Sequence, residues 1–263
     1  MLFFYPIYKM ETKKIPFKSQ PVNKGLLKDA LYTCYENIAF STFPYLKYNL
    51  TSSAKTLEKY NSGNCIALSM FLKRFLKSNY NVNAYLIPTS VPSIFRVEGT
   101  PELCHVSVLV PLSKDSYYIM DPAFYFLEPI FIDSLKPSEG MIESMNIHTK
   151  QRQPIYFSFD KQNNRIKCYF DEPDPWYYYP IEVLNPDEDI GCHFIKHKPQ
   201  PFLCKTHILS NGDVYKKYHL KVENGNFIVL KDQQEVYNGH ENKVPADLKR
   251  ELQIYLYKYF KSV

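Results

Sequence analysis

Apolar residues recur along this chain with two different periods. A period of three to four residues predicts helices, and a period of two residues predicts strands. From Cys65 to Asn79, apolar side chains recur every three or four residues while Lys73, Arg74 and Lys77 fall between them. This spacing predicts an amphipathic helix with one buried face. An earlier segment, Leu26 to Tyr48, also has a helical pattern.

Strand patterns fill much of the middle of the chain. Period-two alternation and short apolar runs bounded by turns predict strands at Val82 to Ile87, His105 to Val110 and Tyr117 to Met120. Residues 140–183 are interpreted as irregular and β-rich, because several prolines interrupt them. Together these segments predict a mainly antiparallel sheet.

The last third of the chain has the pattern of successive strands followed by a helix. Strands are predicted from Phe202 to Val236, with turns at Ser210–Asp213 and Glu223–Asn226. The second turn contains Asn-Gly, which suits a type I′ hairpin. Pro245 is well placed in the first turn of a C-terminal helix.

The composition is that of a globular enzyme. A chain of 263 residues that is 45% hydrophobic can bury a substantial core, to which most of the 23 Tyr and 18 Phe are assigned. The formal charge of +5 is scattered rather than gathered into a basic block, so nucleic acid is not an expected partner. The eight glycines form neither a phosphate-binding loop nor a dinucleotide fingerprint.

Residues 1–8 are apolar but too short to cross a bilayer, and no basic region precedes them. We expect an arm or an edge strand there, and no membrane partner. Six cysteines in a chain without a signal segment are interpreted as reduced thiols of a cytoplasmic protein.

A cluster near the start of the last third of the chain contains residue types that bind zinc. Its members are Cys192, His193, His197, Cys204 and His207. Their spacing matches no common zinc pattern, and the segment already fits strand and loop, so no metal site is predicted.

Cys65 is the candidate nucleophile. It follows Ser62-Gly63-Asn64, whose flexible backbone and cap-forming side chains place it at or near the first helical position. The free N–H groups and the positive end of a helix dipole stabilise a thiolate at such a position. Cys104 is a poorer candidate, because it adjoins His105 and neighbouring strand residues point to opposite faces.

His105 and Asp121 are the candidate base and its orienting carboxylate. They lie equally far from Ser113, so a hairpin that folds about Ser113 places them directly opposite each other, with Cβ atoms roughly 4.5–5.5 Å apart. Asp121 would then orient the ring that takes the proton of Cys65. The backbone N–H of Cys65 is a candidate oxyanion donor, and so is the side-chain amide of Asn64, although Asn at this position is more typical of a helix cap.

These segments resemble the catalytic core of two papain-like families, the transglutaminase-like enzymes and the arylamine N-acetyltransferases. The similarity rests on Gly63-Asn64-Cys65 with its helix, on His105 at the start of an apolar strand, and on the segment Tyr118–Phe124. Asn64-Cys65 and Asp121-Pro122 favour the transglutaminase-like side. Acetyltransferases usually have Glu where this chain has Ala67.

The C-terminal third favours the arylamine N-acetyltransferases, because its strand, Asn-Gly turn, two strands and terminal helix are similar to their last domain. The preceding segment, Glu182–Asn185, resembles the entry to that domain. We therefore expect an α+β fold with a papain-like or transglutaminase-like catalytic core. Its predicted parts are residues 1–80, ending in the nucleophile helix, residues 81–200, with His105 and Asp121 on a β-sheet or barrel, and residues 201–263, with the C-terminal strands and helix.

The resemblance implies a thiol acyltransferase that uses Cys65, His105 and Asp121. Cys65 would take an acetyl or other acyl group from an acyl-CoA co-substrate and pass it to a small-molecule amine, with no permanently bound cofactor. Two alternatives remain open from the sequence. One is a transglutaminase-like enzyme or cysteine peptidase that acts on protein amides, and the other is a non-catalytic interaction protein that retains the fold.

Overall fold

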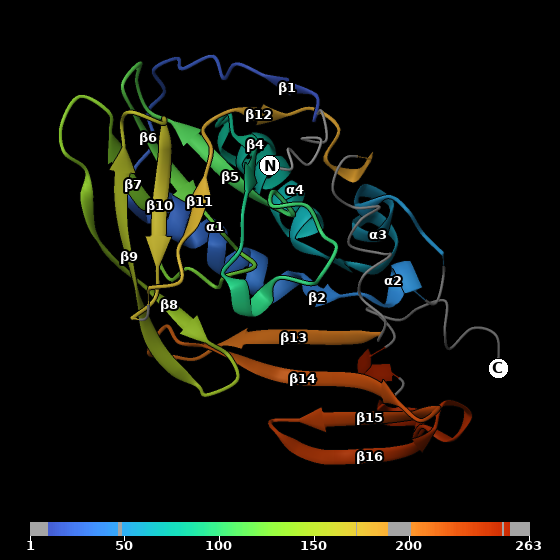
Figure 1. Ribbon diagram of the computed structural model, residues 1–263. Helices are drawn as coiled ribbons and strands as arrows, with labels where there is room; N and C mark the ends of the chain where they lie inside the picture. The colour runs from blue at the N-terminus through green and yellow to red at the C-terminus, as the bar shows by residue number, and fades with distance from the viewer. Residues whose placement is uncertain (1–9, 47–48, 172, 189–200, 249, 253–263) are drawn as a thin grey trace, which may run out of the picture.

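The computed structural model describes residues 10–46, 49–171, 173–188, 201–248 and 250–252. Helices lie against a large curved sheet, and a second sheet formed mainly by the C-terminal strands lies below both (Figure 1). This is the α+β architecture that the sequence predicts. Within these residues, no helix is long and apolar enough to cross a membrane.

The N-terminal part provides most of the helices. They are α1 (Lys24–Asn37), α2 (Phe43–Leu46), α3 (Ser53–Tyr60) and α4 (Cys65–Tyr80). The last of these confirms the predicted amphipathic helix. It ends at Asn81, which adopts a left-handed conformation (φ 53°, ψ 27°) while its N–H bonds to the carbonyls of Leu76 and Lys77.

The helical pattern predicted from Leu26 to Tyr48 is confirmed for α1 and for Phe43–Leu46 of α2, but it is wrong for the residues between them. There the chain turns into a short strand, β2 (Ala39–Ser41), which pairs with a C-terminal strand through Ser41 and Leu203. Short apolar runs suit a helix and a buried strand equally well, so the sequence pattern alone does not distinguish them. The long-range strand pairing decides the conformation.

An eight-stranded sheet holds the middle of the chain in the order β7-β6-β5-β4-β11-β10-β9-β8, and every pair is antiparallel. Its strands are β4 (Tyr85–Thr89), β5 (His105–Pro111), β6 (Ser116–Met120), β7 (Ile130–Asp133), β8 (Glu139–Asn146), β9 (Gln151–Asp160), β10 (Arg165–Tyr169) and β11 (Trp176–Tyr178). Backbone hydrogen bonds from Leu127 to Glu143 and from Met145 to Tyr125 draw β8 toward the β6–β7 connection. The sheet therefore curls almost into a barrel.

This sheet corrects two sequence predictions. The strand expected at Val82 starts later, at Tyr85, because the N–H of Val82 bonds to Leu76 O at the end of α4. Residues 140–183, expected to be irregular and β-rich, are β-rich but more regular than predicted, because β8 to β11 pair in sequence and β12 (Glu182–Val183) pairs with β1 (Thr12–Lys13). The prolines of this stretch lie within the antiparallel pairing or between strands.

The second sheet has the order β16-β15-β14-β13-β2-β3 and confirms the predicted C-terminal strands. They are β13 (Phe202–Ile208), β14 (Val214–Glu223), β15 (Asn226–Lys231) and β16 (Gln234–His240). Asn224 and Gly225 both have positive φ, as a type I′ turn requires. Through β2, the sheet continues to β3 (Ser62–Gly63), which directly precedes the nucleophile segment.

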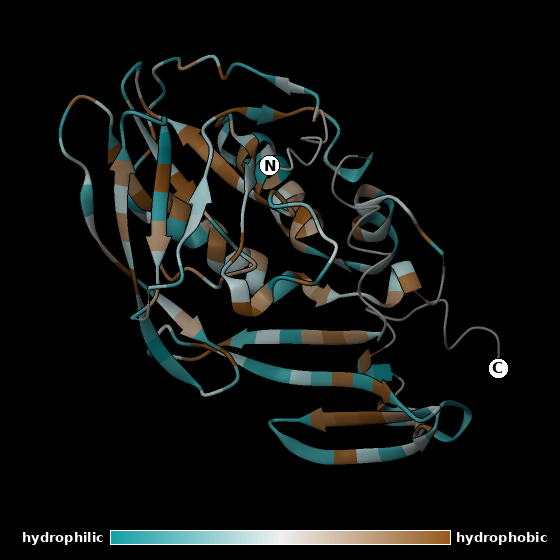
Figure 2. Cartoon of the chain, in the orientation of Figure 1, coloured by the Kyte–Doolittle hydropathy of each residue, from teal (hydrophilic) through white to brown (hydrophobic). Residues whose placement is uncertain are grey.

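Two apolar cores support the sheets. The larger core contains α1, α4 and the inner face of the eight-stranded sheet, and the smaller one lies under β13–β16. Val244, Leu248 and Leu252 belong to the smaller core, and the helix containing the last two starts at residue 246, directly after Pro245 as predicted. Hydrophilic and hydrophobic residues alternate along the second half of β14 (Figure 2), where Tyr218 and Leu220 belong to this core. The predicted N-terminal arm and the end of the C-terminal helix lie outside the described residues.

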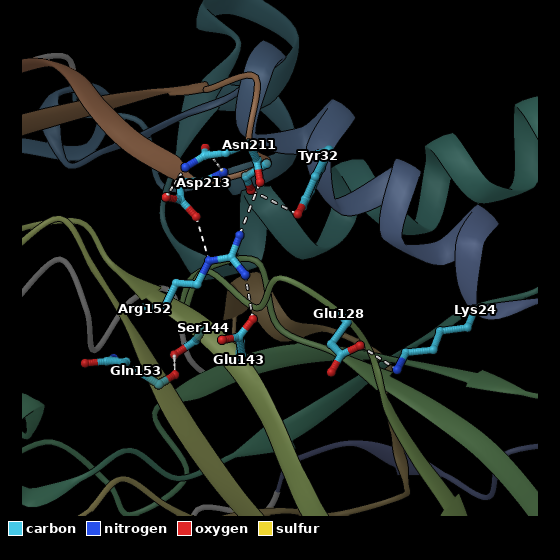
Figure 3. A network of polar contacts seen from close by, with 10 residues as sticks. Lys24, Tyr32, Glu128, Glu143, Ser144, Arg152, Gln153, Asn211 and Asp213 are labelled. Carbon is cyan, nitrogen blue, oxygen red and sulfur yellow. Dashed lines mark hydrogen bonds and ion pairs between the residues drawn. The ribbon is translucent and has the colours of Figure 1, made fainter.

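Arg152 on β9 joins the two sheets (Figure 3). Its guanidinium donates to Asp213 Oδ1 at 2.6 Å, to Glu143 Oε2 at 2.7 Å and to Asn211 O at 3.2 Å. From the other side, the Tyr32 hydroxyl of α1 donates to the carbonyl of Gly212. The β13–β14 turn is therefore held between the eight-stranded sheet and α1.

Candidate active site

Cys65 is the first residue of α4, where the sequence predicts it. Asn64 is the N-cap, and its Oδ1 accepts hydrogen bonds from the backbone N–H groups of Ile66 at 3.1 Å and Ala67 at 3.2 Å. This cap fixes the start of the helix, so that Cys65 lies at the positive end of the helix dipole. The Cys65 side chain lies in a confined place, because the residue is 5% exposed.

Gly63 leaves room for this turn into the helix. A Cβ atom at this position would lie 2.4 Å from Ala67 Cβ, 2.6 Å from Thr56 Oγ1 and 2.9 Å from Tyr45 Oη. These distances are shorter than van der Waals contact, so glycine is required by close packing here. Each residue of the Gly63-Asn64-Cys65 motif thus has its own role. Gly63 allows the close packing, Asn64 caps the helix and Cys65 provides the thiol.

The imidazole of His105 and the carboxylate of Asp121 form the expected hydrogen bond, with His105 Nε2 2.8 Å from Asp121 Oδ2. The expected pairing about Ser113 is wrong, however. Val108 pairs with Met120, so Asp121 follows the register to a position opposite Ser107, two residues from His105. A shift of two residues preserves the face of the sheet, and the imidazole therefore still reaches the carboxylate diagonally.

Asp121 is fully buried, and five hydrogen bonds fix its carboxylate. Besides His105, Oδ2 accepts from the hydroxyls of Ser107 at 2.8 Å and Tyr178 at 3.0 Å. The other oxygen, Oδ1, accepts from the backbone N–H groups of Ala123 and Phe124. Such a set of donors stabilises the ionised carboxylate in a buried place.

Ser107 and Tyr178 are the residues that the sequence reasoning missed. Ser107 could have been found from the sequence, because it lies two positions after His105 and so points to the same face of the strand. Tyr178 belongs to the run Tyr177-Tyr178-Tyr179 on a distant strand, and nothing in the local sequence distinguishes it from its neighbours.

The electrostatics of His105 favour its protonated form. Burial by itself lowers the pKa of His105, but the charge of Asp121, the nearby Cys65 and the hydrogen bond to Asp121 raise this pKa well above its usual range. Since Nε2 is engaged by Asp121, Nδ1 is the ring nitrogen left for the thiol. The arrangement can hold a proton between the sulfur and the imidazole.

The other described cysteines have a different environment. Burial raises the pKa of the thiols of Cys34, Cys104, Cys168 and Cys204, for Cys204 to about 11. All four are therefore protonated at neutral pH and react poorly as nucleophiles.

An aromatic group lines the approach to His105. The ring of Phe124 lies edge-on to the imidazole at a centroid distance of 5.1 Å and contacts Trp176 at the same distance. Phe170 and Phe95 extend this group, and Phe95 is half exposed at 51%. Trp176 is fully buried behind Phe124, so Phe124 and Phe95 are the rings that offer an apolar surface near His105.

The amide nitrogen of Asn64 is available as a donor. Its Nδ2 is buried and has no hydrogen-bond partner among the described residues, while Oδ1 also accepts from the Ser53 hydroxyl at 3.0 Å. An unsatisfied buried donor is uncommon in proteins. One end of the Asn64 side chain therefore caps the helix, while the amide nitrogen at the other end has no partner among the described residues.

The structure does not bring together a metal site among the residues it describes, where no three His, Cys, Asp or Glu side chains are placed to bind an ion. Cys192, His193 and His197 of the sequence cluster lie outside those residues. Of the other two members, Cys204 is buried on β13, and His207 on the same strand pairs with Glu36.

Comparisons with known proteins extend the picture to the whole chain. No family model and no curated protein sequence matches it. Solved structures do match, among them the (BACCR)NAT3 arylamine N-acetyltransferase from Bacillus cereus, described with a Cys-His-Glu catalytic triad. It has 16% identity and a TM-score of 0.59, over 89% of this chain and 92% of that chain. The chain has the arylamine N-acetyltransferase fold.

Two further structures with this fold agree. The arylamine N-acetyltransferase from Salmonella typhimurium has 17% identity and a TM-score of 0.56, over 89% of this chain and 85% of that one. The Mycobacterium marinum enzyme in complex with CoA has 13% identity and a TM-score of 0.56, over 90% and 89%. The resemblance read from the sequence is thus confirmed for the papain-like fold, at the low identity of a divergent relative.

Proposed function

We propose that this protein is a thiol acyltransferase that moves an acyl group from a CoA thioester to an amine, with Cys65, His105 and Asp121 as the catalytic residues. The observation that carries the proposal is the buried His105 imidazole, which bonds through Nε2 to Asp121 and lies near enough to Cys65, at the start of α4, for that residue to help raise the pKa of His105. This is the order of groups that activates a cysteine nucleophile.

In the first half-reaction, the Cys65 thiolate attacks the carbonyl carbon of the thioester. The tetrahedral oxyanion then collapses, the bond to the sulfur of CoA breaks, and this sulfur leaves with the proton held by His105. The backbone N–H of Cys65 and the free Nδ2 of Asn64 are the proposed oxyanion donors.

In the second half-reaction, an amine attacks the acyl carbon bound to Cys65. His105 takes a proton from the attacking nitrogen, the bond between carbon and sulfur breaks, and the thiolate is regenerated beside the imidazolium. Asp121 keeps the ring oriented through both steps, since its own position is fixed by five hydrogen bonds.

Two features support the choice of substrates. One of the similar structures is an arylamine N-acetyltransferase in complex with CoA, which favours acyl-CoA as co-substrate. The ring of Phe124 beside His105, extended by Phe95, favours an aromatic amine as acceptor, because offset or edge-on ring contacts stabilise such a ligand.

Intact-mass spectrometry after incubation with acetyl-CoA tests the proposal. Wild-type protein should gain one acetyl group with release of one free CoA thiol, Cys65→Ser should gain none, and addition of an aromatic amine should remove the group. Cys104→Ser is the matched control and should acetylate as wild type does. Absence of any adduct with acetyl-, propionyl- and malonyl-CoA would refute the proposal, and ammonia release from a glutamine-containing protein would favour a transglutaminase-like reaction instead.

A further inference from the structure

A cavity of about 150 Å³ lies on the C-terminal sheet, away from the Cys65 site. Its lining consists of Lys216 and His219 on β14, Leu230 on β15 and Gln233 in the turn that follows β15. Since one water molecule occupies about 30 Å³ of liquid, the cavity has room for a tetrahedral oxyanion.

A β-bulge brings the two basic side chains to the same face of the sheet. Lys216 and His219 are three positions apart, so an unbroken strand would point them to opposite faces. The pairing shifts, however: Lys216 lies opposite Thr206 and His219 lies opposite Cys204 on β13, with one extra residue on β14 between them. The bulge thus directs both side chains into one cavity.

Lys216 is nearly buried, at 8% exposure, yet no ion pair joins it to a carboxylate anywhere in the described part of the chain. Its Nζ instead lies 3.1 Å from Nδ1 of another basic residue, His148, in the turn between β8 and β9. A buried ammonium without an acidic partner is costly. Burial and mutual repulsion accordingly lower the pKa of His148 and, to about 4, that of His219.

The cluster is held by the rigid junction of the two sheets. The β8–β9 turn contains His148, and Arg152 at the start of β9 binds Asp213 at the start of β14. Cys204 on β13 contacts the hydroxyl of Tyr125, and Tyr125 lies four positions after Asp121 in the chain. The cavity therefore has a fixed position relative to the candidate active site.

We propose that Lys216 and His219, with the Lys216 ammonium positioned by His148, form a binding site for a phosphate group. An oxyanion placed in the cavity would give Lys216 the negative partner it lacks and would accept an N–H hydrogen bond from the His219 imidazole. The phosphate can come from free phosphate or from a phosphate of the coenzyme. The phosphate site itself does not depend on the proposed acyltransferase function. Only the suggestion that the phosphate belongs to the coenzyme rests on that function.

Binding measurements with three probes test the site and its source: inorganic phosphate, acetyl-CoA and S-acetylpantetheine, which lacks phosphate. Lys216→Met keeps the length of the side chain and removes its charge, while Lys161→Met, at an exposed turn, is the matched control. Calorimetry with Cys65→Ser protein avoids acyl transfer. We expect Lys216→Met to weaken the binding of phosphate and acetyl-CoA about tenfold or more, with unchanged binding of S-acetylpantetheine.

His148→Asn provides a second variant at an exposed turn and should weaken phosphate binding by a smaller factor. Loss of phosphate binding in Lys216→Met with unchanged acetyl-CoA affinity would support the site with free phosphate as its source. Wild-type phosphate affinity in both variants, or equal weakening in Lys161→Met, would overturn the proposal. Acetylation of Cys65 by S-acetylpantetheine reports on the proposed function separately, because this donor does not need the phosphate site.

Discussion

The Tyr178 hydroxyl donates a 3.0 Å hydrogen bond to Asp121 Oδ2, although the two residues lie 57 positions apart and their strands do not pair. β4 and β5 separate β11 from β6, so the bond crosses the inside of the curled sheet. Burial and the nearby charge of Asp121 raise the pKa of Tyr178 well above its usual range, which keeps the phenol protonated and able to donate.

Tyr178→Phe should lower the rate of Cys65 acetylation about tenfold. It removes one of three donors to Asp121 Oδ2, and a hydrogen bond to a charged group is worth about 1.5–3 kcal/mol. Stopped-flow measurement of CoA release checks this rate. Tyr177→Phe, the adjacent half-buried residue, is the control and should have the wild-type rate. Equal rates in Tyr178→Phe and wild type would contradict a positioning role for Tyr178.

Gly63→Ala should destabilise the protein by about 1–3 kcal/mol, since the new methyl group overlaps Ala67, Thr56 and Tyr45. Denaturant unfolding followed by circular dichroism measures this loss. Gly225→Ala is a contrasting variant: its Cβ meets no atom within 4 Å, but its φ of 79° adds backbone strain. Equal unfolding free energies for Gly63→Ala and wild type would argue against this steric overlap.

Asn64→Ser separates the cap from the proposed oxyanion donor. Serine is a good N-cap residue, so the helix start should survive with a loss of about 1 kcal/mol or less. Removal of the amide N–H groups should lower the acetylation rate about 10²-fold. Rate and stability are measured on the same preparation, and a fall in stability without a fall in rate would leave Asn64 with the cap role alone.

Brief labelling with iodoacetamide at neutral pH should modify Cys65 first. Burial raises the pKa of Cys34, Cys104, Cys168 and Cys204, whereas Cys65 lies at a helix N-terminus beside an imidazole. Peptide mapping identifies the labelled residue. His105→Gln should slow the labelling of Cys65 and leave the other cysteines unchanged. Preferential labelling of any of the four, with Cys65 intact, is the contrary result.

The stability contributed by His105 should decrease as the pH rises. Its pKa in the folded protein is raised, so the bond between imidazolium and Asp121 contributes fully below the unfolded pKa of about 6.5 and is lost as the pH rises through the raised folded value. The difference in unfolding free energy between wild type and His105→Gln should therefore shrink from pH 6 toward alkaline pH. The exposed His240→Gln serves as control, and a difference that grows with pH would contradict this sign.

The sequence alone determined the local elements and the identity of the candidate catalytic residues. The three- and four-residue spacing of apolar residues after Cys65 predicted α4, because such spacing over a segment of this length places them on one face only in a helix. The Asn-Gly pair fixed the turn between β14 and β15, since few residues tolerate positive φ at both positions. Cap, thiol, imidazole and carboxylate were each visible in short motifs.

The tertiary structure decided what depends on contacts between distant segments. The hairpin register places Asp121 opposite Ser107 rather than His105, and strand pairing with β13 turned residues 39–41 away from a helix. Tyr178 reaches Asp121, and Lys216 reaches His148, across gaps of 57 and 68 residues. Such pairs follow from how the sheets curl and join, which is set by burial over the whole molecule, and local pattern does not contain that information.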